Sequence, residues 1–140
     1  MTEQILDGVS LALSEAFPGC AVYGDARVRQ GLETPSFFIS LGECSQRPLP
    51  NGMVELRQSV EVVYFPERQG DLGELWAIGS SVLGLLGEIT LPDGGRARGS
   101  ALRCGVSDGL MYIGAAYVLR LKPVEQRALM GDMTLINVND

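Results

Sequence analysis

Two strand-like segments with a long connection between them constrain the fold of this 140-residue chain most. Pro35 to Leu41 and Val54 to Phe65 alternate between apolar and polar residues, the period of two expected of a half-buried strand. A tight hairpin needs a connection of only about two to five residues. The connection from Gly42 to Gly52 is far longer, so we expect an extended hairpin loop that reaches a partner.

Two amphipathic helices are predicted, at about Thr2–Phe17 and Asp71–Glu88. Apolar residues recur every three or four positions in both segments, as on the buried face of a helix. Trp76 belongs to the apolar stripe of the second helix, which places it in the core. Gly79 in the same stripe costs about 1 kcal/mol relative to alanine. We expect a close approach of this helix to the sheet to compensate for it.

Three further strands complete the predicted order α–(β)–β–β–α–β–β. A short one is expected near Cys20–Tyr23, and two longer ones, Ala97–Val106 and Leu110–Leu121, flank an Asp108-Gly109 turn. The fold class is therefore α+β, a largely antiparallel sheet with two main helices packed on it. Residues 1–122 form one domain, and residues 123–140 form a C-terminal tail that we expect to contact a partner.

Three apolar side chains fall on the face of the sheet opposite the predicted core. Phe38, Val63 and Phe65 alternate out of phase with Phe37 and its neighbours. A patch of this kind on a sheet face indicates a subunit contact. Coverage of the same patch by the first helix is an equally good interpretation, and the sequence leaves both open.

The composition argues against catalysis. The chain has no histidine, which removes the usual neutral-pH proton shuttle and the histidine-dependent nucleophilic triads. The three cysteines, Cys20, Cys44 and Cys104, form no Cys-x-x-Cys pair, so we expect free thiols in a reducing cytosol and neither a disulfide framework nor a metal site. The sequence thus predicts a non-enzyme without cofactors.

The charge pattern favours protein partners over nucleic acid or membrane. The net charge is −6 and no basic run is present, whereas tight nucleic-acid binding needs a basic stripe. The longest apolar run is shorter than the ~20 residues that a membrane span requires. Arg57 lies between Glu55 and Glu61 on one strand face, a pattern typical of a solvated or interface surface.

The segment from Gly94 to Ser100 has the glycine spacing of a phosphate-binding loop but lacks its lysine. A strand-like alternation follows, whereas the phosphate loop must open a helix. We interpret the segment as a turn leading into a strand. Arg96 and Arg98 then form a small patch that faces anions or carboxylates.

Several short motifs, in order, resemble a family of small proteins from phage and prophage tail-gene clusters. They cover most of residues 5–121 and are Val28-Arg29-Gln30-Gly31-Leu32, Pro35-x-Phe37-Phe38-Ile39, Tyr64-Phe65-Pro66, Arg98-Gly99 and Asp108-Gly109-Leu110. Members of this family are similar to tail terminators and related head–tail joining components. The resemblance implies an α+β structural protein of the virion tail or neck, assembled in the host cytoplasm as a ring that is usually hexameric.

Further expectations follow from the resemblance. Such a ring caps the tail tube, connects to neck or head-completion proteins, touches the sheath in contractile tails, and lets DNA pass without specific binding. We expect the partner interface to include Arg47, Asn51, Arg57, Arg96 and Arg98. Two alternatives remain: a neck connector or baseplate protein, and a small ligand-binding domain whose site would be Cys104 or the Arg96/Arg98 patch.

Overall fold

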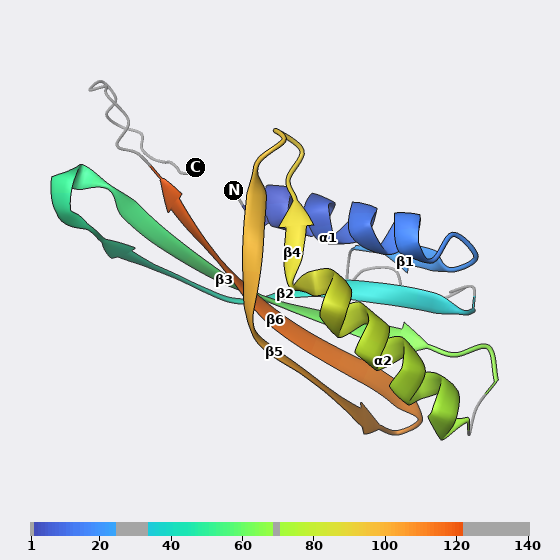
Figure 1. The fold of residues 1–140 in the computed structure, drawn as a ribbon. Coiled ribbons are helices and arrows are strands. Elements are labelled where there is room, and N and C mark those ends of the chain that lie inside the picture. The colour runs from blue at the N-terminus through green and yellow to red at the C-terminus, as the bar shows by residue number, and fades with distance from the viewer. Residues whose placement is uncertain (1, 25–33, 69–70, 122–140) are drawn as a thin grey trace.

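Two helices pack on one face of a six-stranded sheet in the computed structural model, which describes residues 2–24, 34–68 and 71–121 (Figure 1). The strand order is β1-β2-β3-β6-β5-β4, and every neighbouring pair is antiparallel except β1 with β2. The elements are α1 (Thr2–Ala16), β1 (Ala21–Tyr23), β2 (Ser36–Pro48), the short 3-10 helix η1 (Pro50–Gly52), β3 (Val54–Phe65), α2 (Leu72–Leu86), β4 (Glu88–Thr90), β5 (Arg96–Ser107) and β6 (Leu110–Leu121).

This architecture confirms the predicted α+β class and the order of the main elements. The start of α2 follows from its sequence, because the Asp71 carboxylate accepts a hydrogen bond from the main-chain N–H of Glu74 over 3.0 Å. The sequence missed β4, which is three residues long and places only Ile89 in the core. A strand this short shows no alternation that a pattern could detect. The predicted tail, residues 123–140, lies outside the described residues.

The core lies between the helices and one face of the sheet. Phe37 is fully buried at its centre, with ring centroids 5.1 Å from both Phe17 and Tyr64. The alternate residues of β2, β3 and β6 that face the helices pack against the apolar stripes of α1 and α2. The buried members of this cluster include Ile5, Val9, Leu13, Ile39, Val60, Val62, Leu75, Val82, Leu86, Met111, Ile113 and Tyr117.

The placement of Trp76 in the core is wrong, because 47% of this residue is exposed. The buried stripe of α2 is Leu75, Gly79, Val82 and Leu86. Trp76 follows Leu75 by one residue, about 100° further round the helix. A Cβ on Gly79 would lie 2.8 Å from Met111 Cε, so glycine allows the close approach of helix and sheet that the sequence led us to expect.

The predicted long hairpin loop is also wrong, since most of it is strand. β2 passes through a bulge between Leu41 and Cys44 and stays paired with β3 as far as Pro48, opposite Val54. The main-chain N–H of Leu49 donates to the carbonyl of Met53 and closes a short turn. Leu41–Pro48 is exposed throughout. Strand pairing, not burial, holds these residues extended, so the apolar alternation that identifies strands is absent here.

The paired segments form a projecting structure that we call the arm: residues 43–58 of β2 and β3 together with residues 118–121 of β6 (Figure 1). The arm points away from both helices. Gln58, which is 1% exposed, fixes its base. The Gln58 side-chain nitrogen donates to the carbonyls of Gly42 and Glu43 over 3.1 and 3.4 Å. It thereby gives hydrogen-bond partners to two main-chain carbonyls of the bulge.

β5 changes partner along its length. Its second half pairs with β6, while Arg96–Arg98 pairs with β4 instead. The change occurs between Arg98 and Gly99, and the pairing with β6 then passes through an irregularity between Ser100 and Arg103, where Ala101 has a φ of 52°. Just before it, the Gly99 N–H donates to the carbonyl of Gly87 over 2.8 Å. The first half of β5 therefore crosses the end of α2 while the rest stays in the main sheet (Figure 1).

Candidate functional site

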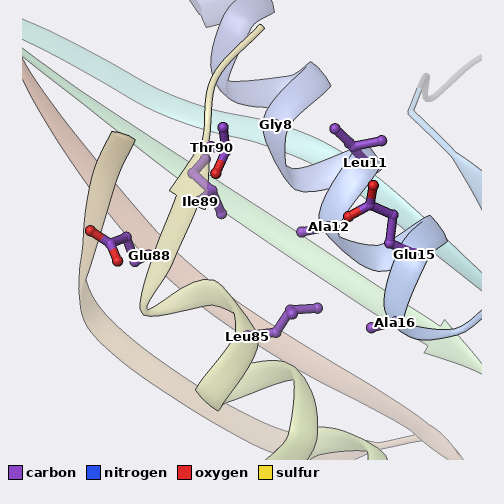
Figure 2. A pocket seen from close by; sticks show the side chains of 9 residues that line it. All are labelled: Gly8, Leu11, Ala12, Glu15, Ala16, Leu85, Glu88, Ile89 and Thr90. Atoms are coloured by element: carbon purple, nitrogen blue, oxygen red, sulfur yellow. The ribbon is translucent and has the colours of Figure 1, made fainter. Parts of the chain in front are cut away.

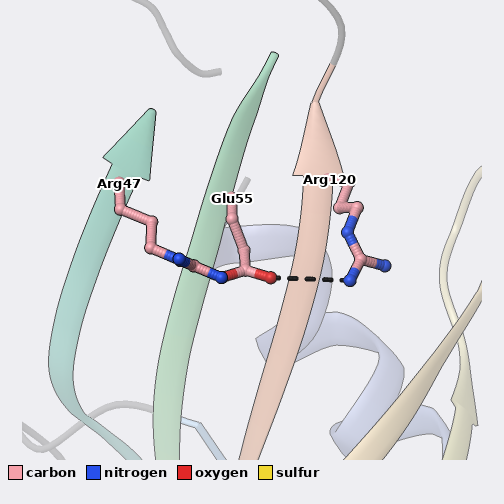
Figure 3. A network of polar contacts seen from close by, with 3 residues as sticks. All are labelled: Arg47, Glu55 and Arg120. Carbon is pink, nitrogen blue, oxygen red and sulfur yellow. Dashed lines mark hydrogen bonds and ion pairs between the residues drawn. The ribbon is translucent and has the colours of Figure 1, made fainter. Parts of the chain in front are cut away.

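A row of three charged side chains crosses the arm. Arg47, Glu55 and Arg120 are aligned in register on β2, β3 and β6. Arg47 Nε donates to Glu55 Oε1 over 2.6 Å, and Arg120 Nη2 lies 3.6 Å from Glu55 Oε2 (Figure 3). The hydrogen bond from Arg47 is the largest cause that lowers the pKa of the Glu55 carboxyl, and the charges of Arg47, Arg120 and Arg57 act in the same direction.

The arm gathers three of the five predicted interface residues. Arg47 has 69% of its side chain exposed, Arg57 is exposed on the same face, and Asn51 lies in the turn at the tip. The turn requires left-handed backbone at Asn51 (φ 68°) and Gly52 (φ 75°), conformations that these two residue types tolerate best. The tip is thus a defined, exposed structure.

Arg120 is the member of this row that sequence reasoning missed. It lies near the end of a strand that is mostly apolar, and 66% of its side chain is exposed. If the segments Val54–Phe65 and Leu110–Leu121 are aligned as antiparallel neighbours, Arg120 falls opposite Glu55 and on the same face of the sheet. The signal was present, but it depended on knowing that the two strands are neighbours.

Arg96 and Arg98 form a separate cluster on the part of β5 that pairs with β4. Arg96 Nη1 lies 3.9 Å from Glu88 Oε1, and Arg98 is opposite Glu88 in the register. The preceding glycines form a turn in which Asp93 accepts a hydrogen bond from the Gly95 N–H over 2.8 Å. The segment is therefore a turn into a strand, as predicted, and its arginines lie beside a carboxylate of the same chain.

A shallow groove of about 290 Å³ separates α1 from β4 and the end of α2 (Figure 2). Leu11 and Ala12 of α1 contribute to one wall, and Leu85 and Ile89 contribute to the other. Two carboxylates, from Glu15 on α1 and Glu88 on β4, lie on opposite sides. The apolar lining suits a side chain better than a reacting small molecule.

The apolar patch opposite the core is not covered by the first helix. Phe38, Val63 and Tyr112 are aligned in register across β2, β3 and β6. The side chains of α1 pack instead on the opposite face, against Phe37 and its neighbours. Of the two interpretations left open by the sequence, the helix cover is excluded. The subunit contact stays a prediction.

The three cysteines, Cys20, Cys44 and Cys104, are free thiols. Burial, followed by the nearby Glu74 carboxylate, raises the pKa of the Cys20 thiol, and Cys44 is exposed on the arm. Within residues 2–24, 34–68 and 71–121, no three His, Cys, Asp or Glu side chains are grouped so that they could hold a metal ion. Neither helix of the described chain has the length and apolarity needed to cross a bilayer.

Comparison with known families gives one match, which spans nearly the whole chain. A family described as phage tail terminator protein matches residues 4–128. No curated protein matches the chain. The matched range contains α2, the arm, both arginine clusters and all of α1 except its first two residues, so the likeness extends to every surface described above.

Proposed function

The chain belongs to the phage tail terminator family, and on that premise we propose that it caps the tail tube as a closed ring of identical subunits. The family is one of structural tail proteins, so the chain acts by binding other proteins and not by catalysis. In the proposed role, the ring stops polymerisation of the tube and offers its other side to the neck. Six subunits are the number we expect.

The observation that carries this proposal is the family match over residues 4–128. The arm supports it, because a strand-paired projection with an exposed tip is suited to reach a neighbouring ring. The arm arginines Arg47, Arg57 and Arg120 supply donors for carboxylates on partner proteins. We propose that the tail tube protein and the neck protein are those partners, with the sheath protein added in a contractile tail.

The acidic composition fits the passage of DNA through the ring. A net charge of −6 for each chain repels phosphates, so DNA would not adhere to the wall of the lumen. This part of the proposal predicts that the purified protein does not retain duplex DNA at physiological salt.

Electron microscopy of tails assembled with and without the protein tests the proposal. A terminator leaves overlong tails when it is absent, and its ring is found at the head-proximal end when it is present. Tails of normal length that fail to join heads would instead favour a neck connector. Tails of normal length that join heads without the protein would overturn both roles.

An arm-shortened variant sharpens the test. Residues 46–56 are replaced by Asn-Gly, which joins the paired residues Ser45 and Arg57 through a tight turn. The helices and the cluster around Phe37 are untouched and Leu56 is the one buried hydrophobic side chain lost, so the variant should fold but fail to regulate tail length or to join heads. The matched control keeps the arm at full length and replaces Arg47 and Arg57 by alanine, which separates the effect of reach from that of charge.

A further inference from the structure

The arm has two strand edges without a partner in the described part of the chain. β1 pairs with β2 only along Ser36–Phe38, so the outer side of β2 is open from residue 39 to residue 48. On the other side, the register of β5 with β6 ends at Gly99 and Tyr117. Beyond that point residues 118–121 of β6 pair with β3 alone.

Open edges of this length are unusual in a folded protein. Each carries a row of main-chain N–H and C=O groups ready to bind another strand, and proteins normally shorten or cover such edges. The outermost strands, β1 and β4, are only three residues long and so obey this rule, whereas the outer side of β5 from Ser100 to Ser107 has no strand partner among the described residues. The arm does not, and its β2 edge is the longest open edge among the described residues.

We propose that these two edges bind each other between copies of the chain, the β2 edge of one arm pairing with the β6 edge of the next. The contact joins two different surfaces of the same molecule, so it repeats from copy to copy and closes into a ring when the rotation allows. The inference rests on the proposed ring and names the surfaces that would build it.

Charge on the two edges is complementary. Alternation from Arg47 places Ser45 and Glu43 on the charged face of the arm, the face that also carries Arg120. Glu43 is exposed and makes no ion pair with a described residue. The Arg120 side chain is 66% exposed, and its Nη2 lies 3.6 Å from Oε2 of Glu55, a carboxylate that also accepts a hydrogen bond from Arg47. When one sheet continues into the next, this acid and this base lie on the same face of adjacent strands.

Cross-linking between two single-cysteine edges tests the contact directly. Cys44 is first replaced by serine, and Glu43→Cys and Arg120→Cys are then made in separate proteins. Mild oxidation should give a disulfide-linked dimer of the two variants when they are mixed, and much less from either variant alone. Arg57→Cys is the matched control, because it lies on the same face of the central strand and not at an edge.

Charge reversal gives a second, independent measurement on the full chain. Glu43→Arg should raise the concentration needed for association about tenfold, since it places like charges side by side. Adding Arg120→Glu on the other edge should recover most of that loss. Light scattering and microscopy report the oligomer in each case.

The outcomes separate this inference from the proposed function. Rings that form without a mixture-specific cross-link, and that ignore both charge changes, would overturn the edge pairing and leave the terminator role intact. A specific cross-link in open chains or dimers, with no ring at tube ends, would support the edge pairing and overturn the ring.

Discussion

Tyr117, in the middle of β6, donates a hydrogen bond from its phenolic oxygen to the main-chain oxygen of Leu86 at the end of α2, over 2.7 Å. Both residues are fully buried, and burial raises the pKa of the Tyr117 phenol. A helix leaves its last carbonyls without intrahelical partners. The tyrosine satisfies one of them inside the core and thereby fixes the end of α2 to the sheet.

Tyr117→Phe should lower the free energy of unfolding by about 1–3 kcal/mol, because the Leu86 carbonyl would be buried without a donor. The ring itself stays in place, so no cavity forms. Urea denaturation followed by circular dichroism measures the change. Tyr112→Phe is the control, since Tyr112 lies half-buried on the opposite face of the same strand. Equal effects from the two substitutions would contradict the role given to the hydrogen bond.

Gly99→Ala should be far more damaging than Gly105→Ala, although both glycines lie in β5. A Cβ at position 99 would lie 2.3 Å from the Leu86 carbonyl oxygen, a main-chain atom that cannot move away alone. A Cβ at position 105 meets nothing within 4 Å. We expect a loss of more than about 3 kcal/mol or failure to fold at position 99, and a change within about 1 kcal/mol at position 105. Thermal unfolding of the two variants compares them.

Trp76 is the single tryptophan of the chain and reports on the outer face of α2. With 47% of the residue exposed, its fluorescence in the isolated protein should resemble that of a solvated indole and be readily quenched by acrylamide. Leu72, one turn earlier, is 57% exposed and extends the same apolar surface. A blue shift on assembly would place this surface in an interface. A blue-shifted, unquenched spectrum of the monomer would contradict the structure.

The sequence predicted best those elements whose apolar residues repeat regularly. Both helices and β3 have one buried face, and that face imposes a readable period, whereas the hairpin of β5 and β6 was marked by its Asp108-Gly109 turn. The predicted burial of Trp76 was wrong for a related reason, because nearly every turn of α2 carries apolar residues on more than one side of the helix. The close packing of Gly79 against Met111 determines which apolar side of α2 is buried. This is a tertiary contact that the periodicity of the sequence does not encode.

The strands of the arm could not be predicted from apolar periodicity, because neither face of the arm needs to be apolar. The long Gly42–Gly52 connection was correctly identified as unusual, yet its residues are strand because β3 pairs with them. Arg47, Asn51 and Arg57 were expected at one surface and do lie together on the arm, whereas Arg96 and Arg98 lie on β5, in the part that pairs with β4. Sequence distance alone could not separate the two groups.

Acid should loosen the arm through Glu55. The pKa of the Glu55 carboxyl is lower in the folded protein than in the unfolded chain, where it is about 4.3. The ionised carboxylate therefore contributes fully to stability above the pKa of the unfolded chain, and this contribution is lost as the pH falls through the pKa of the folded protein. Hydrogen exchange of arm amides should therefore accelerate, relative to those of the core, between neutral pH and acid, after correction for intrinsic rates. High salt should reduce the effect, because Arg47 and Arg120 are largely exposed.

Glu55→Gln separates this effect from general acid unfolding. The amide keeps the size of the side chain and can still accept from Arg47, but it carries no charge to lose. We expect the exchange of arm amides in this variant to lose its acid dependence while that of the core keeps its own. If the variant and the parent chain show the same acid response in the arm, the charged row across β2, β3 and β6 does not stabilise it. The rigidity of the projection would then have to come from main-chain pairing alone.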